Sequence, residues 1–121
     1  MSPVSGSTKT ITTHVLDTSR GRPAEGVPIV LEMRSGLGEW REVGRGSTDA
    51  DGRLRTLIAE GSPLEAATYR LTFDTAAYFH SLGVEGFYPE ASIVFAVRDP
   101  LQHYHVPLLL SPYGYATYRG S

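Results

Sequence analysis

The sequence has 121 residues and a mass of 13.2 kDa, which fits a single domain. Eleven Lys and Arg residues against 13 Asp and Glu give a net charge of -2, so no basic excess exists to neutralise a nucleic-acid backbone. The absence of Cys excludes disulfides, thiolate nucleophiles and Cys-based zinc or iron–sulfur sites. No apolar run is long enough to span a bilayer, and the polar start of the chain has no secretory pattern. We therefore expect a soluble, cytoplasmic domain whose partners include neither nucleic acid nor membrane.

The N-terminal half of the chain reads as a tail followed by short strands. Residues 1–8 are Ser-rich and polar, and we expect a flexible tail ahead of one domain over residues 9–121. The first predicted strand, Lys9–Leu16, is rich in Thr, Ile and Val, which favour a pleated surface. Turn-forming residues then separate three further predicted strands, Val27–Arg34, Glu39–Arg45 and Arg53–Ile58.

The C-terminal half contains one predicted helix among four strands. Ala67–Phe73 alternates apolar and polar residues, the period of a strand. Asp74 is a predicted N-cap for a helix over Thr75–Leu82, which Gly83 ends. The last predicted strands are Ala91–Val97, His103–Leu110 and Gly114–Arg119. Eight short strands and one helix after the fifth strand predict an all-β, antiparallel β-sandwich, whose exposed edges make oligomerisation plausible.

Three histidines, His14, His103 and His105, lie on strand faces opposite the predicted apolar faces. His103 and His105 share one face of the seventh strand, and the opposite face is almost wholly apolar and must pack in the core. The histidine face continues through Pro107 and Leu109, so it is polar at one end and apolar at the other. Such a face predicts a contact with another subunit or a ligand. His14 lies opposite the apolar face of the first strand, and on its own a solvated or hydrogen-bonded structural histidine is favoured over a functional one.

A metal site is not favoured by the pattern. The His-x-His pair projects two rings from one side of a strand, but no further ligands follow at a recognisable spacing. The C-terminal Tyr118–Ser121 is unusual, because a hydroxyl, a guanidinium and a terminal carboxylate suit the binding of a small polar molecule. Composition alone nevertheless favours an ordinary last strand with a charged end.

Three stretches of the sequence carry a resemblance to a known family: Ile11–Asp17 (ITTHVLD), Asp51–Arg53 (DGR) and His103–Ser121. They are similar to those of the 5-hydroxyisourate hydrolases, the enzymatic branch of the transthyretin-like proteins. The terminal Tyr-Arg-Gly-Ser is the most specific element, because transthyretins proper lack it. The resemblance covers nearly the whole chain from about Lys9, with Ala116 standing where many relatives carry Ser.

The resemblance implies a fold, an assembly and a reaction. The fold is an eight-stranded transthyretin-like sandwich with one short helix, and the assembly is a homotetramer, a dimer of dimers with a channel lined by the faces of His14 and His105. The reaction is hydrolysis of 5-hydroxyisourate, the product of urate oxidation, to 2-oxo-4-hydroxy-4-carboxy-5-ureidoimidazoline. No metal or organic cofactor is implied.

The resemblance also implies two overlapping sets of site residues. The catalytic residues are His14, Arg53, His105 and Ser121. The substrate-binding residues are His14, Arg53, His103, Tyr118, Arg119 and Gly120. A neutral imidazole is the natural base near neutral pH, and we prefer His14 for water activation and His105 for proton transfer, although the sequence does not decide between them. Arg53 would polarise the attacked carbonyl.

Two other functions compete with hydrolysis at this stage. The first is a non-catalytic carrier of small molecules that uses the same tetramer channel; the presence of His14 and of the Arg-Gly-Ser ending argues against it. The second is a structural interaction domain, which would leave the mixed histidine face unexplained.

Overall fold

The computed structural model describes residues 10–121, so the predicted N-terminal tail and Lys9 lie outside the described residues. The described chain forms nine strands and one helix: β1 (Ile11–Asp17), β2 (Arg22–Pro23), β3 (Pro28–Arg34), β4 (Arg41–Ser47), β5 (Arg53–Leu54), β6 (Ala67–Phe73), α1 (Thr75–Ser81), β7 (Ala91–Val97), β8 (Tyr104–Ser111) and β9 (Gly114–Thr117). Apart from β5 and β9, each predicted strand agrees with the observed one within two residues at either end. In this part of the chain no helix combines the length and apolar character needed to cross a membrane.

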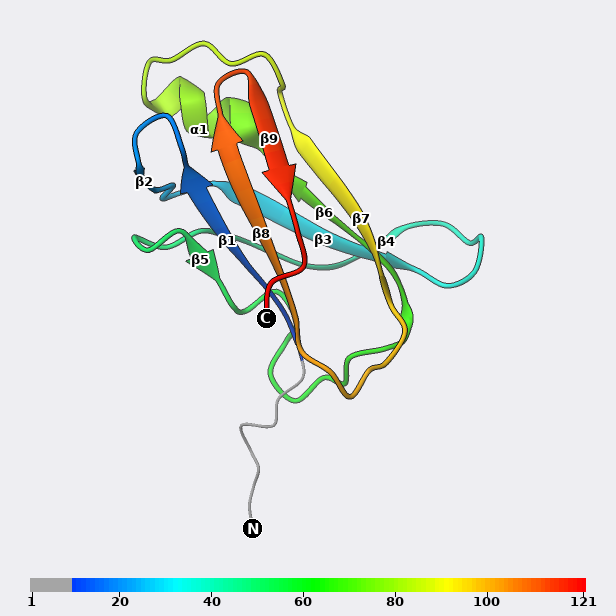
Figure 1. The fold of residues 1–121 in the computed structure, drawn as a ribbon. Coiled ribbons are helices and arrows are strands. Elements are labelled where there is room, and N and C mark those ends of the chain that lie inside the picture. Colours follow the sequence, from blue (N-terminus) through cyan, green and yellow to red (C-terminus); the bar gives the residue numbers. More distant parts are fainter. Residues whose placement is uncertain (1–9) are drawn as a thin grey trace.

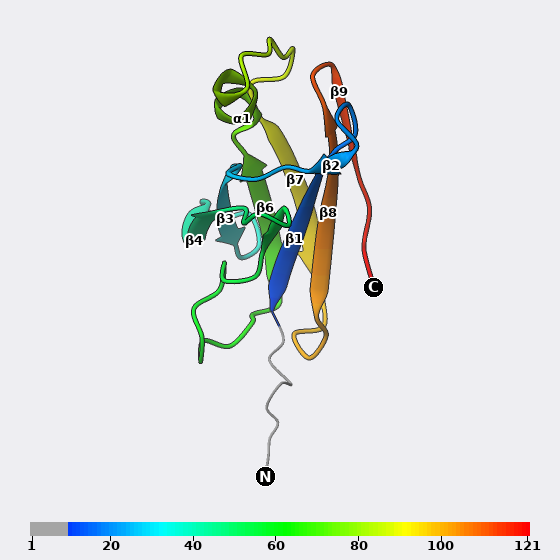
Figure 2. The same cartoon turned by 90° about the vertical axis from the view of Figure 1, so that its left-hand side faces the viewer.

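The strands form two facing sheets, which confirms the predicted sandwich (Figures 1 and 2). One sheet has the order β2-β1-β8-β9, and β5 pairs with β1 on the same edge as β2; the other has the order β4-β3-β6-β7. One pair differs from the antiparallel pattern, because β1 and β8 run parallel. This pairing joins the two ends of the sequence at the centre of one sheet, as Figure 1 shows.

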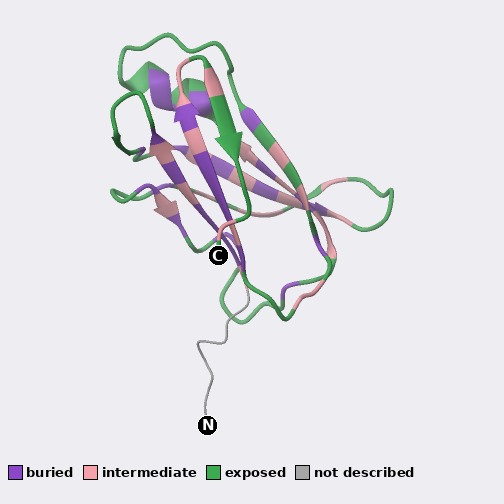
Figure 3. Cartoon of the chain, viewed as in Figure 1, coloured by how far each residue is buried: buried purple, intermediate pink, exposed green. Residues whose placement is uncertain are grey.

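The core lies between the sheets and follows the predicted alternation. Along β6, Tyr69, Leu71 and Phe73 are buried, and the intervening residues are partly exposed. The same alternation of buried and partly exposed positions runs through β3, and through β8 except at Pro107, which is also buried (Figure 3). The apolar face of β8 is the one predicted from sequence, and its four residues are Tyr104, Val106, Leu108 and Leu110. The opposite face of β1 and β8 is therefore turned away from the core.

Two differences from the predicted strands have a clear physical reason. Arg22–Pro23 pairs with the end of β1 inside a segment expected to be a turn, so α1 follows the sixth strand rather than the fifth. The predicted strand Arg53–Ile58 keeps only its first two residues. Leu57 and Ile58 are buried, and Leu57 lies against Gly44 of β4, so the chain leaves the edge of β1 and crosses to the other sheet.

The last strand ends at Thr117 instead of Arg119 because of its neighbour on β8. The β8–β9 register pairs Leu108 with Thr117, and the same register reappears in an isolated bridge between His105 and Gly120. Between them, Pro107 has no N–H to donate to the ladder. The carbonyl of Pro107 accepts instead from Thr117 Oγ1 at 2.7 Å. The interruption lets the chain leave the sheet for two residues and then return beside His105.

The helix is placed as the sequence predicts and is tied to β1. The Asp74 side chain accepts a hydrogen bond from the Ala77 N–H at 3.0 Å, so it is the N-cap. The Tyr78 hydroxyl donates to Asp17 Oδ2 at 2.7 Å. Burial alone would raise the pKa of Asp17, but hydrogen bonds from Ser19, Tyr78 and two backbone N–H groups hold it below its ordinary value. An ionised Asp17 therefore anchors the end of β1 under the helix.

Candidate active site

The outer face of β1 and β8 gathers the polar residues that the sequence singled out. The parallel register places Thr12 beside His105 and His14 beside Pro107. Thr12 is 8% exposed, whereas His14 and His105 are half-buried. The two histidines thus lie on the face opposite the core, as their strand parity predicted.

Arg53 joins this face from β5, next to His14 in the register. The turn before it is held firmly: Asp49 Oδ1 accepts hydrogen bonds from the N–H groups of Asp51 at 2.9 Å and Arg53 at 3.0 Å. Gly52 has a φ of 76°, and a side chain there would come within 2.4 Å of the Val15 carbonyl oxygen. The Asp-x-Asp-Gly turn is therefore what brings Arg53 against β1.

The C-terminal segment returns to the same face through Gly120. Its N–H donates to the His105 carbonyl at 2.8 Å, and a Cβ at Gly120 would lie 2.6 Å from His105 Cδ2. Because a glycine at this position is what lets the segment approach the imidazole so closely, it also places Ser121 beside His105.

These elements enclose a pocket of about 380 Å³, lined by Thr12, Thr13, Arg53, Arg55, His103, His105 and Ser121. Four of the residues predicted for the site are therefore brought together: Arg53, His103, His105 and Ser121. His14 lies beside Arg53 in the sheet without lining this pocket.

Sequence reasoning missed three polar residues of the pocket, Thr12, Thr13 and Arg55. Thr12 shares the strand parity of His14, which was a usable signal. Arg55 offered a similar signal, because it lies two residues from Arg53 and shares its face in the predicted strand Arg53–Ile58, although the observed β5 ends at Leu54.

One hydroxyl joins the two rings of the His-x-His pair. Thr12 Oγ1 lies 2.9 Å from His105 Nδ1 and 3.1 Å from His103 Nε2, both hydrogen-bond distances. The parallel register explains the contact, since Thr12 is the direct neighbour of His105. The Thr12 hydroxyl therefore fixes how both imidazoles stand in the pocket.

The electrostatics of the pocket favour a neutral imidazole among cations. Burial, and then the charges of Arg53, His14 and His103, lower the pKa of His105 below its ordinary 6.5. Within the described chain neither Arg53 nor Arg55 forms a salt bridge, and no Asp or Glu side chain lines the pocket. A neutral imidazole can accept a proton, and an arginine can hold developing negative charge. Across residues 10–121 no three His, Asp or Glu side chains cluster as a metal site would require.

Tyr118 and Arg119 lie elsewhere. Both line a separate groove of about 240 Å³ between β7 and β8. The Arg119 guanidinium stacks 4.5 Å from the centre of the Tyr104 ring and donates to Gln102 Oε1 at 2.8 Å. In this chain Arg119 fastens the terminal segment to the loop before β8, and it does not line the pocket that was predicted for it.

The fold and this pocket can now be compared with known proteins. The family model described as HIUase/Transthyretin family matches residues 11–120. The 5-hydroxyisourate hydrolase of Salmonella dublin is 44% identical over 111 residues, covering 92% of this chain and 80% of that protein. The structure of Klebsiella pneumoniae 5-hydroxyisourate hydrolase is 41% identical with a TM-score of 0.79, covering 94% of this chain and 100% of that one. Sea bream transthyretin in complex with thyroxine is 35% identical with a TM-score of 0.82, covering 91% and 93%.

These matches extend over nearly all of the described residues, and they include a relative that is well above 30% identical over most of its own length. The TM-scores of 0.79 and 0.82 to the two solved structures add a likeness of fold to the likeness of sequence. The chain belongs to the HIUase/Transthyretin family.

Proposed function

We propose that this chain hydrolyses 5-hydroxyisourate, opening its six-membered ring to 2-oxo-4-hydroxy-4-carboxy-5-ureidoimidazoline in the degradation of urate. The observation that carries the proposal is that His105, whose pKa burial and neighbouring positive charges hold below its ordinary value, lies in a pocket with Arg53 and without Asp or Glu side chains. Relatives named for this activity, from Salmonella and Klebsiella, support it. Fold likeness does not discriminate, because the TM-score to a transthyretin, 0.82, is at least as high as the 0.79 to the hydrolase.

The proposed mechanism begins with a water molecule in the pocket. His105 is the general base, since its lowered pKa keeps the ring neutral near pH 7 and ready to take a proton from water. This exchanges the roles preferred from sequence, because His105 lines the pocket and His14 does not. The water oxygen attacks the ring carbonyl, the C–N bond of the lactam breaks, and the leaving nitrogen receives a proton.

Charge and orientation come from the other pocket residues. The planar Arg53 guanidinium polarises the carbonyl and holds the negative charge that develops on its oxygen. His14, beside Arg53 in the sheet, contacts the substrate from that side. The Ser121 hydroxyl orients the ring, while Gly120 keeps the terminal segment close to His105. Tyr118 and Arg119 act on the substrate indirectly, by holding that segment in place.

We also propose that the working form is a homotetramer, a dimer of dimers, in which the site faces a channel between dimers. Two features support this assembly. The outer face of β1 and β8 continues past the histidines into Leu16 and Leu109, which are half-buried. The strands β7 and β9 are sheet edges that expose Val94 and Tyr115. We place the protein in the cytoplasm, because a chain without Cys gains nothing from an oxidising compartment.

The second candidate is a non-catalytic carrier, favoured by the likeness to the thyroxine-bound sea bream protein. The pocket argues against it, because imidazole, guanidinium and hydroxyl groups line it, whereas pockets for drug-sized ligands are lined predominantly by apolar groups.

An optical assay separates the two functions. Urate is oxidised in the cuvette, and the disappearance of 5-hydroxyisourate is followed with and without the protein. Hydrolysis predicts a decay that is faster than the spontaneous one and proportional to protein concentration. A carrier predicts no acceleration and a saturable thyroxine titration.

A further inference from the structure

The Thr12 hydroxyl makes two contacts that the proposed mechanism does not yet use. It lies within hydrogen-bond distance of His105 Nδ1 and His103 Nε2, and Thr12 is only 8% exposed. Among residues 10–121 these two ring nitrogens are the only hydrogen-bond partners of the hydroxyl. His103 is exposed and, like His105, lines the pocket, so the three groups form a short hydrogen-bonded chain that starts and ends at the pocket and also reaches solvent at His103.

The number of available protons limits how the hydrogen bonds among His105, Thr12 and His103 can be arranged. A hydroxyl has one proton to donate and can accept others, and a neutral imidazole carries its single proton on one of two nitrogens. If both ring nitrogens donated to Thr12, its own buried proton would have no acceptor in the described chain, which costs about 1–3 kcal/mol. The Thr12 proton therefore goes to one ring, and the other ring donates to Thr12.

Two arrangements remain, and in each the two rings hold the same tautomer. In the first, His105 donates from Nδ1 and Thr12 donates to His103 Nε2, so both rings carry their proton on Nδ1. In the second, Thr12 donates to His105 Nδ1 and both rings carry it on Nε2. The first leaves a lone pair on His105 Nε2, and a lone pair rather than an N–H is favoured in a pocket that Arg53 and Arg55 also line.

We propose that Thr12 is a positioning residue that holds His105 and His103 in the Nδ1–H tautomer and connects them as a proton relay. Resting on the proposed hydrolysis, this deepens it by assigning the path of the proton. It also gives His103, whose role the sequence left open, a definite place at the far end of the relay.

The relay balances the hydrolytic step. As the water oxygen bonds to the carbonyl carbon, His105 Nε2 takes a water proton and His105 Nδ1 gives its proton to Thr12 Oγ1. The Thr12 proton passes to His103 Nε2, and His103 Nδ1 releases its proton to the leaving nitrogen as the C–N bond breaks. One proton has moved from water to nitrogen, and both rings are now Nε2–H. The rings reset when exposed His103 takes a proton from solvent at Nδ1 and a proton passes through Thr12 to His105 Nδ1. His105 Nε2 then releases its proton to solvent.

The first test needs no substrate and no variant. Nitrogen-15 NMR of the imidazoles in the resting protein reports which nitrogen carries the proton, and we expect Nδ1–H for both His105 and His103. Thr12→Val removes the hydroxyl and keeps the shape of the side chain. In this variant we expect the two rings no longer to share the Nδ1–H tautomer and to shift toward Nε2–H. An Nε2–H His105 in the parent, or unchanged tautomers in Thr12→Val, would overturn the proposal.

The second test separates a relay from simple support of the fold. We expect Thr12→Val to lower kcat by about 10²-fold, within the usual worth of a positioned proton transfer, with KM little changed. Thr12→Ser keeps the hydroxyl and is expected to restore most of kcat. Thr48→Val is the matched control, since it removes a buried hydroxyl with two partners, Ala24 and Val27, away from the pocket. It is expected to lower the melting temperature and leave kcat unchanged.

The outcomes distinguish this inference from the proposed function. If the parent shows Nδ1–H rings but does not accelerate the loss of 5-hydroxyisourate, the proposed function fails. If the parent hydrolyses it and Thr12→Val does so equally well, the relay fails and the hydrolysis stands.

Discussion

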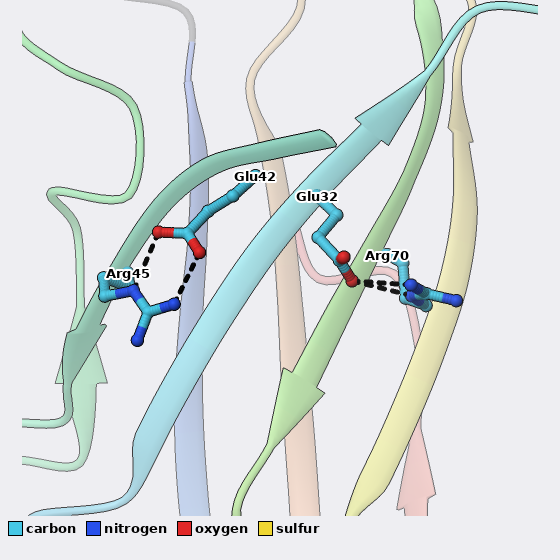
Figure 4. Close-up of polar contacts among 4 residues, drawn as sticks. All are labelled: Glu32, Glu42, Arg45 and Arg70. Carbon is cyan, nitrogen blue, oxygen red and sulfur yellow. Dashed lines mark hydrogen bonds and ion pairs between the residues drawn. The ribbon is translucent and has the colours of Figure 1, made fainter. Parts of the chain in front are cut away.

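The outer faces of the two sheets differ in whether their arginine side chains have ion-pair partners. On the four-stranded sheet, Arg70 of β6 forms an ion pair with Glu32 of β3 at 2.8 Å, and Arg45 donates to Glu42 at 2.7 Å along β4 (Figure 4). Trp40 adds a second partner, with the Arg70 guanidinium 4.3 Å from its ring centre. These cations are satisfied within the chain.

The outer face of β1, β5 and β8 lacks such partners. Arg53 and Arg55 form no salt bridge within the described residues, and the depressed pKa of His105 keeps a third basic group neutral. Backbone hydrogen bonds, and then the nearby charges of Arg55 and Arg53, lower the pKa of Asp49, but its carboxylate pairs with neither guanidinium. Positive groups without direct ion-pair partners repel one another, so folding alone gives little reason to collect them. The outer face of β1, β5 and β8, with Arg53 and Arg55 unpaired among the described residues, is therefore the unbalanced face. It is suited to a ligand whose carbonyl oxygens interact with these arginines.

The balanced face also owes its pairing to a detail of β4. Residues three apart in a regular strand point to opposite faces. The register between β3 and β4 shifts at Leu31 and Glu32, and this bulge returns Glu42 and Arg45 to the same side. The local irregularity thus completes an ion pair within one strand.

The largest effect is expected on replacing the base. His105→Asn keeps a polar side chain but removes the group that accepts a proton, and kcat is expected to fall by about 10²–10⁴-fold. The measurement is the rate of 5-hydroxyisourate loss above the spontaneous rate. His80→Asn, on the exposed last turn of α1, is the control and should leave the rate unchanged. Near-parental turnover in a folded His105→Asn would contradict the assignment.

A matched pair of arginine variants tests the comparison itself. Arg53→Lys keeps the charge and loses the planar fork, so activity is expected to fall more than about tenfold with little change in melting temperature. Arg70→Lys weakens a surface ion pair, so stability is expected to fall by up to about 1 kcal/mol with activity unchanged. Turnover and thermal unfolding of both proteins are measured side by side. The reverse pattern would mean that Arg53 is structural and that the active face has been misplaced.

The pH dependence follows from the depressed pKa of His105. A base must be unprotonated to act, so kcat/KM is expected to hold as pH falls through 6.5 and to decline only below it. Arg53→Gln removes one cause of the depression, so the His105 pKa, followed by NMR titration, should move up toward 6.5. Arg70→Gln should leave it in place. An acid limb above pH 6.5 would show that another group controls the rate.

The smallest effect is expected at the terminal segment. Arg119→Gln removes the stacking on Tyr104, which is worth about twofold to fivefold at an exposed site, and KM is expected to rise by that amount. Steady-state kinetics measures the change. A loss of activity comparable with that of Arg53→Lys would show that Arg119 itself contacts the substrate.

Strand parity allowed much of the site to be predicted. The faces of His14 and His105 followed from alternation with the buried residues Val15 and Val106, which burial enforces. The same alternation carries Arg119 to the face opposite Gly120, in line with its stacking on Tyr104.

Other features depend on contacts that the sequence does not display. The Thr12 bridge requires the parallel register of β1 and β8, which joins residues 93 apart along the chain. The short β2 pairs through its backbone, whose hydrogen bonds have no side-chain pattern. The shortening of β5 depends on Leu57 finding a place in the core, a property of the assembled sheets.

The central claim, that the unbalanced face of β1, β5 and β8 is the active site, is tested most directly by locating a bound ligand. Urate, a planar ring with the same carbonyl chemistry, can be titrated into nitrogen-15-labelled protein while backbone amide shifts are followed. The account predicts that shifts gather at Thr12, Arg53, His105 and Ser121. Shifts that gather instead around Glu32 and Arg70, or in the groove of Tyr118, would contradict it.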